Sequence, residues 1–181
     1  GLKLMLELDA INYSPAALWL ANWYTNGLAV PRDYSKAMEY LKSAYSNGDK
    51  LAIVEAARNI GWAYENGFGV EIDFNNAKKW YEKAVQLGEE FGEDALALAN
   101  LGRLYKEGLA GEQDIMKSIS LLERAVDLGD LEATHLLANI YENGIGVERD
   151  FEKARNICKE AVDNIEDFGK ASTVYELAVD T

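Results

Sequence analysis

The sequence is poor in the residues from which catalytic centres, metal sites and disulfides are built. Among 181 residues there is one histidine, His135, and one cysteine, Cys158. One cysteine excludes an intrachain disulfide framework, and one histidine leaves no second member for a Ser/His, Cys/His or two-histidine metal arrangement. A general acid and base could still be present among the carboxylates. We nevertheless expect no enzyme, no metal site and no cofactor.

Basic charge and long apolar runs are also scarce. The formal net charge is −13, from 31 acidic and 18 basic residues, and such a field repels phosphate backbones and anionic lipid. No apolar run reaches the roughly 18 residues that a membrane helix needs. We expect a soluble chain, cytoplasmic or exported with any signal segment removed, that inserts in no membrane, binds no nucleic acid and meets a protein with a basic or neutral surface. Alternatively, the acidity serves only solubility.

Four copies of one pattern fill the chain. Each copy has a tyrosine, a glycine three residues later and an aspartate nine residues later, and the tyrosines are 40, 41 and 36 residues apart. A period of this size is typical of helical repeat proteins. The residues are Tyr24, Tyr64, Tyr105 and Tyr141, then Gly27, Gly67, Gly108 and Gly144, then Asp33, Asp73, Asp114 and Asp150.

Each copy is predicted to form two helices. Ala56, Ile60 and Ala63 recur at the spacing of one buried helix face. Gly67 is suited to end that helix in a left-handed conformation, and Asp73 to cap the next one, predicted from Phe74 to Leu87. We expect one repeat domain over 1–181, and helix for residues 2–8. The units are predicted at about 15–48, 55–88, 95–129 and 132–165, with a capping helix over 168–181.

Two sequence blocks carry a family resemblance. The segments 101–105 (LGRLY) and 144–154 (GIGVERDFEKA) are similar to the Sel-one-like repeats (SLRs), relatives of the tetratricopeptide repeats. The resemblance implies an all-α, right-handed α/α superhelical solenoid that serves as a scaffold or adaptor. Bacterial members of the family are often involved in host interaction, in signalling, or in neutralising a secreted effector as immunity proteins.

Some positions depart from the family pattern. Ala29 and Ala110 replace the second loop glycine, found at Gly69 and Gly146 in the other copies, so we expect the first and third loops to differ in conformation. One family branch carries a disulfide in every repeat and binds β-lactams, and a chain with one cysteine does not belong to it. Cys158 aligns with core-like positions of the other copies and is expected to be buried.

Binding residues are predicted on the first helix of each pair, which lines the concave side of such solenoids. Positions two, five and six residues before each repeat tyrosine form one stripe along that helix. The tryptophans and arginines there are the types that dominate interface hot spots. The stripe that we predict to contact a partner contains Leu18, Trp19, Asn22, Arg58, Asn59, Trp62, Asn100, Arg103, His135 and Asn139.

Three functions follow as hypotheses. The leading one is a non-enzymatic scaffold or adaptor that binds a protein on its concave face. A narrower form is a bacterial immunity protein that neutralises a secreted effector enzyme, motivated by the acidity and small size. The third is a hydrolase or small-ligand receptor that uses the concave groove, which would need a convergent polar cluster in a deep pocket.

Overall fold

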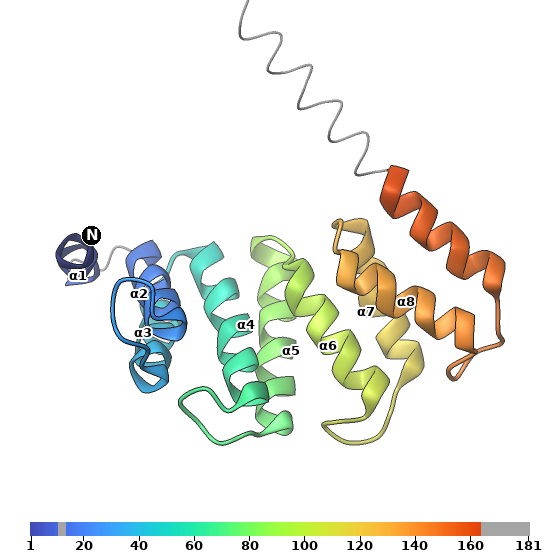
Figure 1. Cartoon of the computed structure of the whole chain (residues 1–181), viewed down its shortest axis with the longest axis horizontal. Helices are drawn as coiled ribbons and strands as arrows, with labels where there is room; N and C mark the ends of the chain where they lie inside the picture. The colour runs from blue at the N-terminus through green and yellow to red at the C-terminus, as the bar shows by residue number, and fades with distance from the viewer. Residues whose placement is uncertain (11–13, 164–181) are drawn as a thin grey trace, which may run out of the picture.

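The protein is described by a computed structural model covering residues 1–10 and 14–163. Within these ranges the chain forms nine helices and no strand, arranged side by side in one row (Figure 1). This arrangement confirms the predicted all-α solenoid, including a helix over residues 2–8. The helices are α1 (Leu2–Ala10), α2 (Ser14–Asn26), α3 (Tyr34–Asn47), α4 (Lys50–Asn66), α5 (Phe74–Phe91), α6 (Ala95–Glu107), α7 (Ile115–Asp127), α8 (Leu131–Asn143) and a helix over 151–163.

The tyrosine, glycine and aspartate of each copy build the turn between two paired helices. The backbone N–H of the aspartate donates to the tyrosine carbonyl at 2.8 to 3.0 Å in all four copies. The aspartate carboxylate then accepts from the N–H three residues later, as Asp73 does from Asn76 at 2.9 Å. The glycines have φ between 66° and 73°, the left-handed region. Both predicted roles are therefore confirmed, and each cap stabilises its helix by about 1 kcal/mol.

The additional residues of the second copy lengthen its two helices. The helix α4 starts at Lys50, where Asp49 caps it by accepting from Ala52 N–H at 2.9 Å. The helix α5 continues to Phe91 rather than ending at Leu87 as predicted. Aspartates also cap α6 and α8, with Asp94 before α6 and Asp130 before α8.

Two loop glycines lie where one repeat contacts the preceding one. A Cβ on Gly69 would come within 2.3 Å of the Tyr34 carbonyl oxygen at the start of α3, and one on Gly146 within 2.7 Å of Ile115 at the start of α7. The loop of the first copy has no preceding repeat in the described chain, so Ala29 meets no such contact. In the third loop, Gly111 takes the positive φ, at 127°, one residue after Ala110.

A buried polar cluster joins the second and third copies. The Tyr81 hydroxyl on α5 donates to Glu65 on α4 at 2.9 Å, and Glu65 forms an ion pair with Arg103 on α6. Burial raises the pKa of the Tyr81 hydroxyl, and the Glu65 carboxylate raises it further, so the group stays protonated and donates. The Glu65 and Arg103 side chains are only 12% and 19% exposed. We refer to these three residues as the Glu65 clamp.

The C-terminal end of the described solenoid differs from the sequence prediction. Cys158 is exposed, so the prediction that it is buried was wrong. Its counterparts Leu41, Tyr81 and Leu122 are buried because a further helix of the array covers each of them. For Cys158 that helix would come from the predicted cap over 168–181, which lies outside the described residues.

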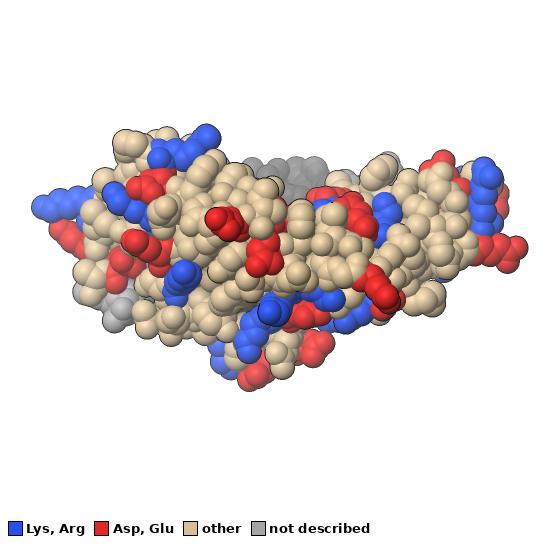
Figure 2. Space-filling model, turned by 90° about the horizontal axis from the view of Figure 1, so that it is seen from below, with Lys and Arg blue, Asp and Glu red and all other residues tan. Residues whose placement is uncertain are grey.

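Charges of both signs are distributed over the lower face of the solenoid. Figure 2, seen from below relative to Figure 1, shows Lys and Arg interspersed with Asp and Glu on this face. The acidic excess therefore forms no single patch there, and the electrostatics of a binding site depend on the side chains that line it.

The contact between the second loop and the first repeat generates a stability prediction. Gly69→Ala should lower the free energy of unfolding by about 2 to 3 kcal/mol, because the new Cβ meets Tyr34 backbone atoms and φ is +74°. Gly129→Ala is the matched control, since its φ is similar at +84° but nothing lies within 4 Å of an added Cβ. Urea unfolding measures both variants. Equal losses would contradict the proposed role of the repeat contact.

The Glu65 clamp generates a second prediction. Arg103→Ala should destabilise the chain by about 2 kcal/mol, because it leaves the largely buried Glu65 carboxylate without its cation. Arg155→Ala removes an exposed pair with Glu152 and should change stability by less than about 0.5 kcal/mol. Thermal unfolding followed by circular dichroism compares the two variants. A small effect of Arg103→Ala would show that the clamp does not stabilise the solenoid.

Candidate partner-binding site

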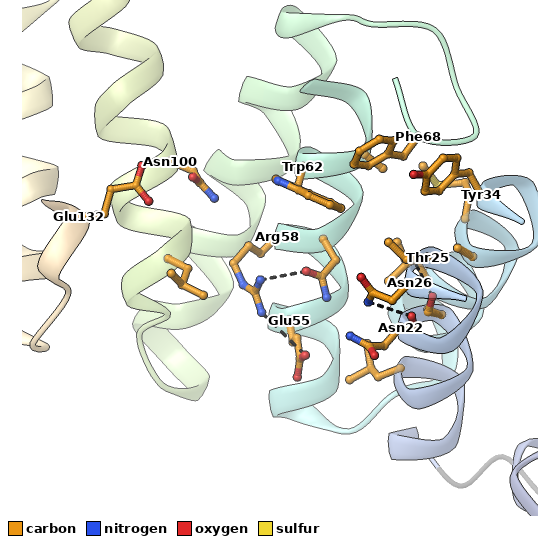
Figure 3. A pocket seen from close by; sticks show the side chains of 18 residues that line it. Asn22, Thr25, Asn26, Tyr34, Glu55, Arg58, Trp62, Phe68, Asn100 and Glu132 are labelled. Carbon is orange, nitrogen blue, oxygen red and sulfur yellow. Dashed lines mark hydrogen bonds and ion pairs between the residues drawn. The ribbon is translucent and has the colours of Figure 1, made fainter. Parts of the chain in front are cut away.

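Six of the ten predicted binding residues line one groove across the first helices of the pairs. The groove has a volume of about 380 Å³ and is lined from α2, α3, α4, α6, α8 and the loop after α4. Figure 3 shows its side chains, with Trp62 and Arg58 on α4 between residues of α2 and α6. We refer to this hollow as the central groove. The six predicted residues are Leu18, Asn22, Arg58, Asn59, Trp62 and Asn100.

One wall of the central groove is aromatic. The ring of Phe68, from the loop after α4, stacks on Tyr34 with ring centroids 4.4 Å apart. It also packs at a tilt against Trp62, with ring centroids 4.7 Å apart. Trp62 is still 39% exposed, so its ring is supported on one side and open to solvent on the other. A supported and exposed aromatic ring is a suitable contact for an apolar group or a cation.

Trp19 lies beside the central groove rather than in it. It lines an adjoining hollow of about 420 Å³ together with Leu51, and Leu18 and Asn22 border both hollows. Trp19 is 55% exposed and Leu51 66% exposed. The two hollows therefore form a continuous surface that exposes large apolar side chains.

The groove amides divide into two kinds. Asn26, the last residue of α2, donates to the carbonyl of Asn22 in the preceding turn, and the side-chain oxygen of Asn59 accepts from Arg58. The side chains of Asn22 and Asn100, by contrast, form no hydrogen bond with any other residue of the described ranges. Their donors and acceptors are therefore available to a partner.

The arginine in the groove is held by its neighbours. Arg58 donates through Nε to Asp94 at 2.8 Å and through Nη1 to the Asn59 side chain at 2.9 Å, and Glu55 lies 3.8 Å from Nη2. Its side chain is only 17% exposed. Asp94 is also the N-cap of α6, so Arg58 joins α4 to α6 and its charge is compensated within the chain.

The sequence stripe omitted residues that the groove includes. Glu55 and Glu132 line the central groove, and each lies nine residues before its repeat tyrosine. Extending the predicted stripe by one helical turn toward the N-terminus of each first helix would have included both glutamates. Tyr34 and Phe68 had no such signal, because they come from the start of α3 and from a loop.

The three remaining stripe residues line neither of the two hollows. Arg103 belongs to the Glu65 clamp and also pairs with Glu107 at 3.3 Å. His135 is exposed on α8, and Asn139 is half-buried on the same helix. These residues therefore continue the first-helix stripe beyond the groove without entering it.

Two features are absent from the described part of the chain. Across residues 1–10 and 14–163, no three His, Cys, Asp or Glu side chains are placed so that they could bind a metal ion together. In the same ranges, none of the helices combines the length and the apolar character needed to span a membrane.

Comparison with known proteins identifies the repeats. The model of the Sel1 repeat matches residues 14–49, 54–89, 95–130 and 131–164. The Sel1-repeat-containing protein YjcO of Escherichia coli K12 is 34% identical over 139 residues, which are 74% of this chain and 53% of that protein. The chain thus spans about half the length of this relative.

Further relatives come from eukaryotes and from crystal structures. Cytochrome c oxidase assembly factor 7A of Xenopus laevis is 27% identical over 88% of this chain and 68% of its own. Activator of C kinase protein 1 of Saccharomyces cerevisiae is 36% identical over 45% of this chain and 13% of its own. The crystal structure of a Sel1 repeat protein from Oxalobacter formigenes aligns with a TM-score of 0.77 and 26% identity, covering 90% of this chain and 62% of that one. With four matched repeats forming the observed helix pairs, this chain belongs to the Sel1 repeat family.

Proposed function

We propose that this protein is a non-enzymatic scaffold or adaptor that binds another protein on the face formed by α2, α4, α6 and α8. One observation carries the proposal. Trp19 and Trp62 remain 55% and 39% exposed on that face, beside a groove lined by several helices. Large aromatic residues left exposed next to a hollow are typical of protein interfaces rather than of a monomer surface.

The environments of the aromatic residues support this assignment. Tyr81 and Leu122, on the second helices, are fully buried, and Tyr40 and Trp80 pack against the core. The first helices instead direct Trp62 and Asn100 into the central groove. Trp19 and Trp62, on α2 and α4, thus remain open to solvent, whereas Tyr40, Trp80 and Tyr81, on α3 and α5, pack into the solenoid.

The family supports the same general class of function. Sel1 repeats generally mediate interactions between proteins. Two relatives are named as an activator of C kinase and as a cytochrome c oxidase assembly factor, descriptions that both refer to other proteins. A catalytic role has less support, because the groove arginine is engaged in structural contacts.

Affinity capture tests the proposal. Immobilised wild-type chain should retain at least one partner from lysate of the cells that encode it, and Trp19→Ala/Trp62→Ala should lose that partner by tenfold or more. Each interface tryptophan is worth about 2 kcal/mol when it lies near the centre of a contact. Captured proteins are quantified by mass spectrometry. Arg103 is left unchanged, because its replacement would weaken the Glu65 clamp.

The control removes exposed apolar side chains elsewhere. Leu28→Ala/Met116→Ala truncates two residues that are each 68% exposed and that line neither hollow. This variant should retain the partner, and circular dichroism should show the same helical content in all three proteins. Retention of every partner by the tryptophan variant, or equal loss from both variants, would refute the location of the site.

A further inference from the structure

We propose that the central groove binds an extended, lysine- or arginine-rich segment of the partner, whose main chain meets the groove amides and whose cations meet Trp62, Glu55 and Glu132. This inference rests on the proposed function, because it assumes that a partner binds this face. It adds the chemical nature of the bound segment, which neither the family nor the relatives specify.

The charges that line the groove select a cation. Glu55 and Glu132 are the carboxylates in the lining, and Arg58 is the only basic residue among the described lining residues. Arg58 is already compensated by Asp94 and lies 3.8 Å from Glu55, whereas Glu132 forms no salt bridge with any described residue. The Glu55 side chain is still 50% exposed. An anionic segment would thus find no available cation in the groove, while a cationic one would find Glu132 free of ion pairs and the exposed part of Glu55. The net charge of −13 favours the same partner at long range.

The aromatic wall provides a second contact for a cation. Phe68 holds the Trp62 ring in a tilted contact at 4.7 Å, and Tyr34 supports Phe68 from behind. The exposed surface of an indole attracts a lysine ammonium or an arginine guanidinium, and it also packs on the aliphatic part of these side chains. Trp62 and Glu132 line the same groove, so an aromatic surface and a carboxylate are available together.

The available amides favour an extended main chain. A carboxamide can donate to a peptide carbonyl and accept from a peptide N–H at once. Asn22 on α2 and Asn100 on α6 are unpaired within the described residues, and the amide nitrogen of Asn59 on α4 is also unused. The three amides come from three successive first helices, so an extended segment that crosses these helices would meet one amide from each.

Three synthetic peptide pools test the inference by fluorescence anisotropy. Each pool contains labelled peptides of about twelve residues, long enough to cross the first helices. Alternate positions are a mixture of Ala, Ser, Leu and Val in all pools, and the other positions are Lys or Arg, Glu or Asp, or Gln or Asn. Wild-type protein should bind the basic pool roughly tenfold more tightly than the neutral pool, and the acidic pool least. The preference should decrease between about 50 and 300 mM salt.

Variants assign the preference to the groove. Glu55→Gln/Glu132→Gln should weaken binding of the basic pool roughly tenfold. Glu112→Gln/Glu148→Gln makes the same charge change at exposed loop positions and should weaken it less than about twofold. Trp62→Leu keeps an apolar side chain but removes the ring, so it should weaken the basic pool more than the neutral one. Asn22→Ala/Asn100→Ala should weaken both pools by the same factor, because the main chain is common to them.

Each other outcome overturns the inference in a recognisable way. A preference for the acidic or neutral pool would exclude a basic segment and leave the scaffold proposal intact, provided that affinity capture still depends on the tryptophans. A basic preference that responds equally to both glutamine variants would indicate nonspecific attraction to an acidic protein. Failure of wild-type protein to bind any pool would exclude extended segments as ligands. The scaffold proposal itself is tested separately, by the tryptophan dependence of partner capture.

Discussion

The solenoid depends on the turn in which one aspartate closes a helix pair. Its N–H binds the carbonyl of the repeat tyrosine, and its carboxylate caps the second helix, in all four copies. One residue thus fixes the end of one helix and the start of the next. Because the turn is the same each time, the first helices of successive pairs repeat in orientation, and α2, α4, α6 and α8 share one face. The groove is a consequence of that repetition.

In the groove, some side chains form contacts that stabilise the solenoid, and others remain available to a partner. Arg58 is engaged by Asp94 and Arg103 by Glu65, so both cations help to join the second repeat to the third. The groups left available are the Trp62 ring, the Asn22 and Asn100 amides, the Glu132 carboxylate and the exposed part of Glu55, which also lies 3.8 Å from Arg58. A face with aromatic surface, main-chain hydrogen-bonding capacity and negative charge is suited to binding another polypeptide.

The sequence predicted features that recur or are local. The helix caps and the left-handed glycines follow from spacings within each copy, and the all-α solenoid was implied by the family resemblance; the structure confirms all three. The binding stripe shares six residues with the groove, but the ion pairs of Arg58 and Arg103 join residues 36 and 38 positions apart and carry no periodic signal. The prediction that Cys158 is buried was wrong, because it was made from the aligned positions of the other copies. Those positions are covered by a following helix, and Cys158 is exposed in the described structure.

Site-specific photocrosslinking to the captured partner tests most directly whether the groove face is the binding face. Asn26 is a suitable position for a photoreactive phenylalanine analogue, because it lines the central groove but its amide serves its own helix. Gln86, exposed on α5, is the matched position on a second helix. The account predicts a crosslink to the partner from position 26 and none from position 86. A crosslink from position 86 alone would contradict it.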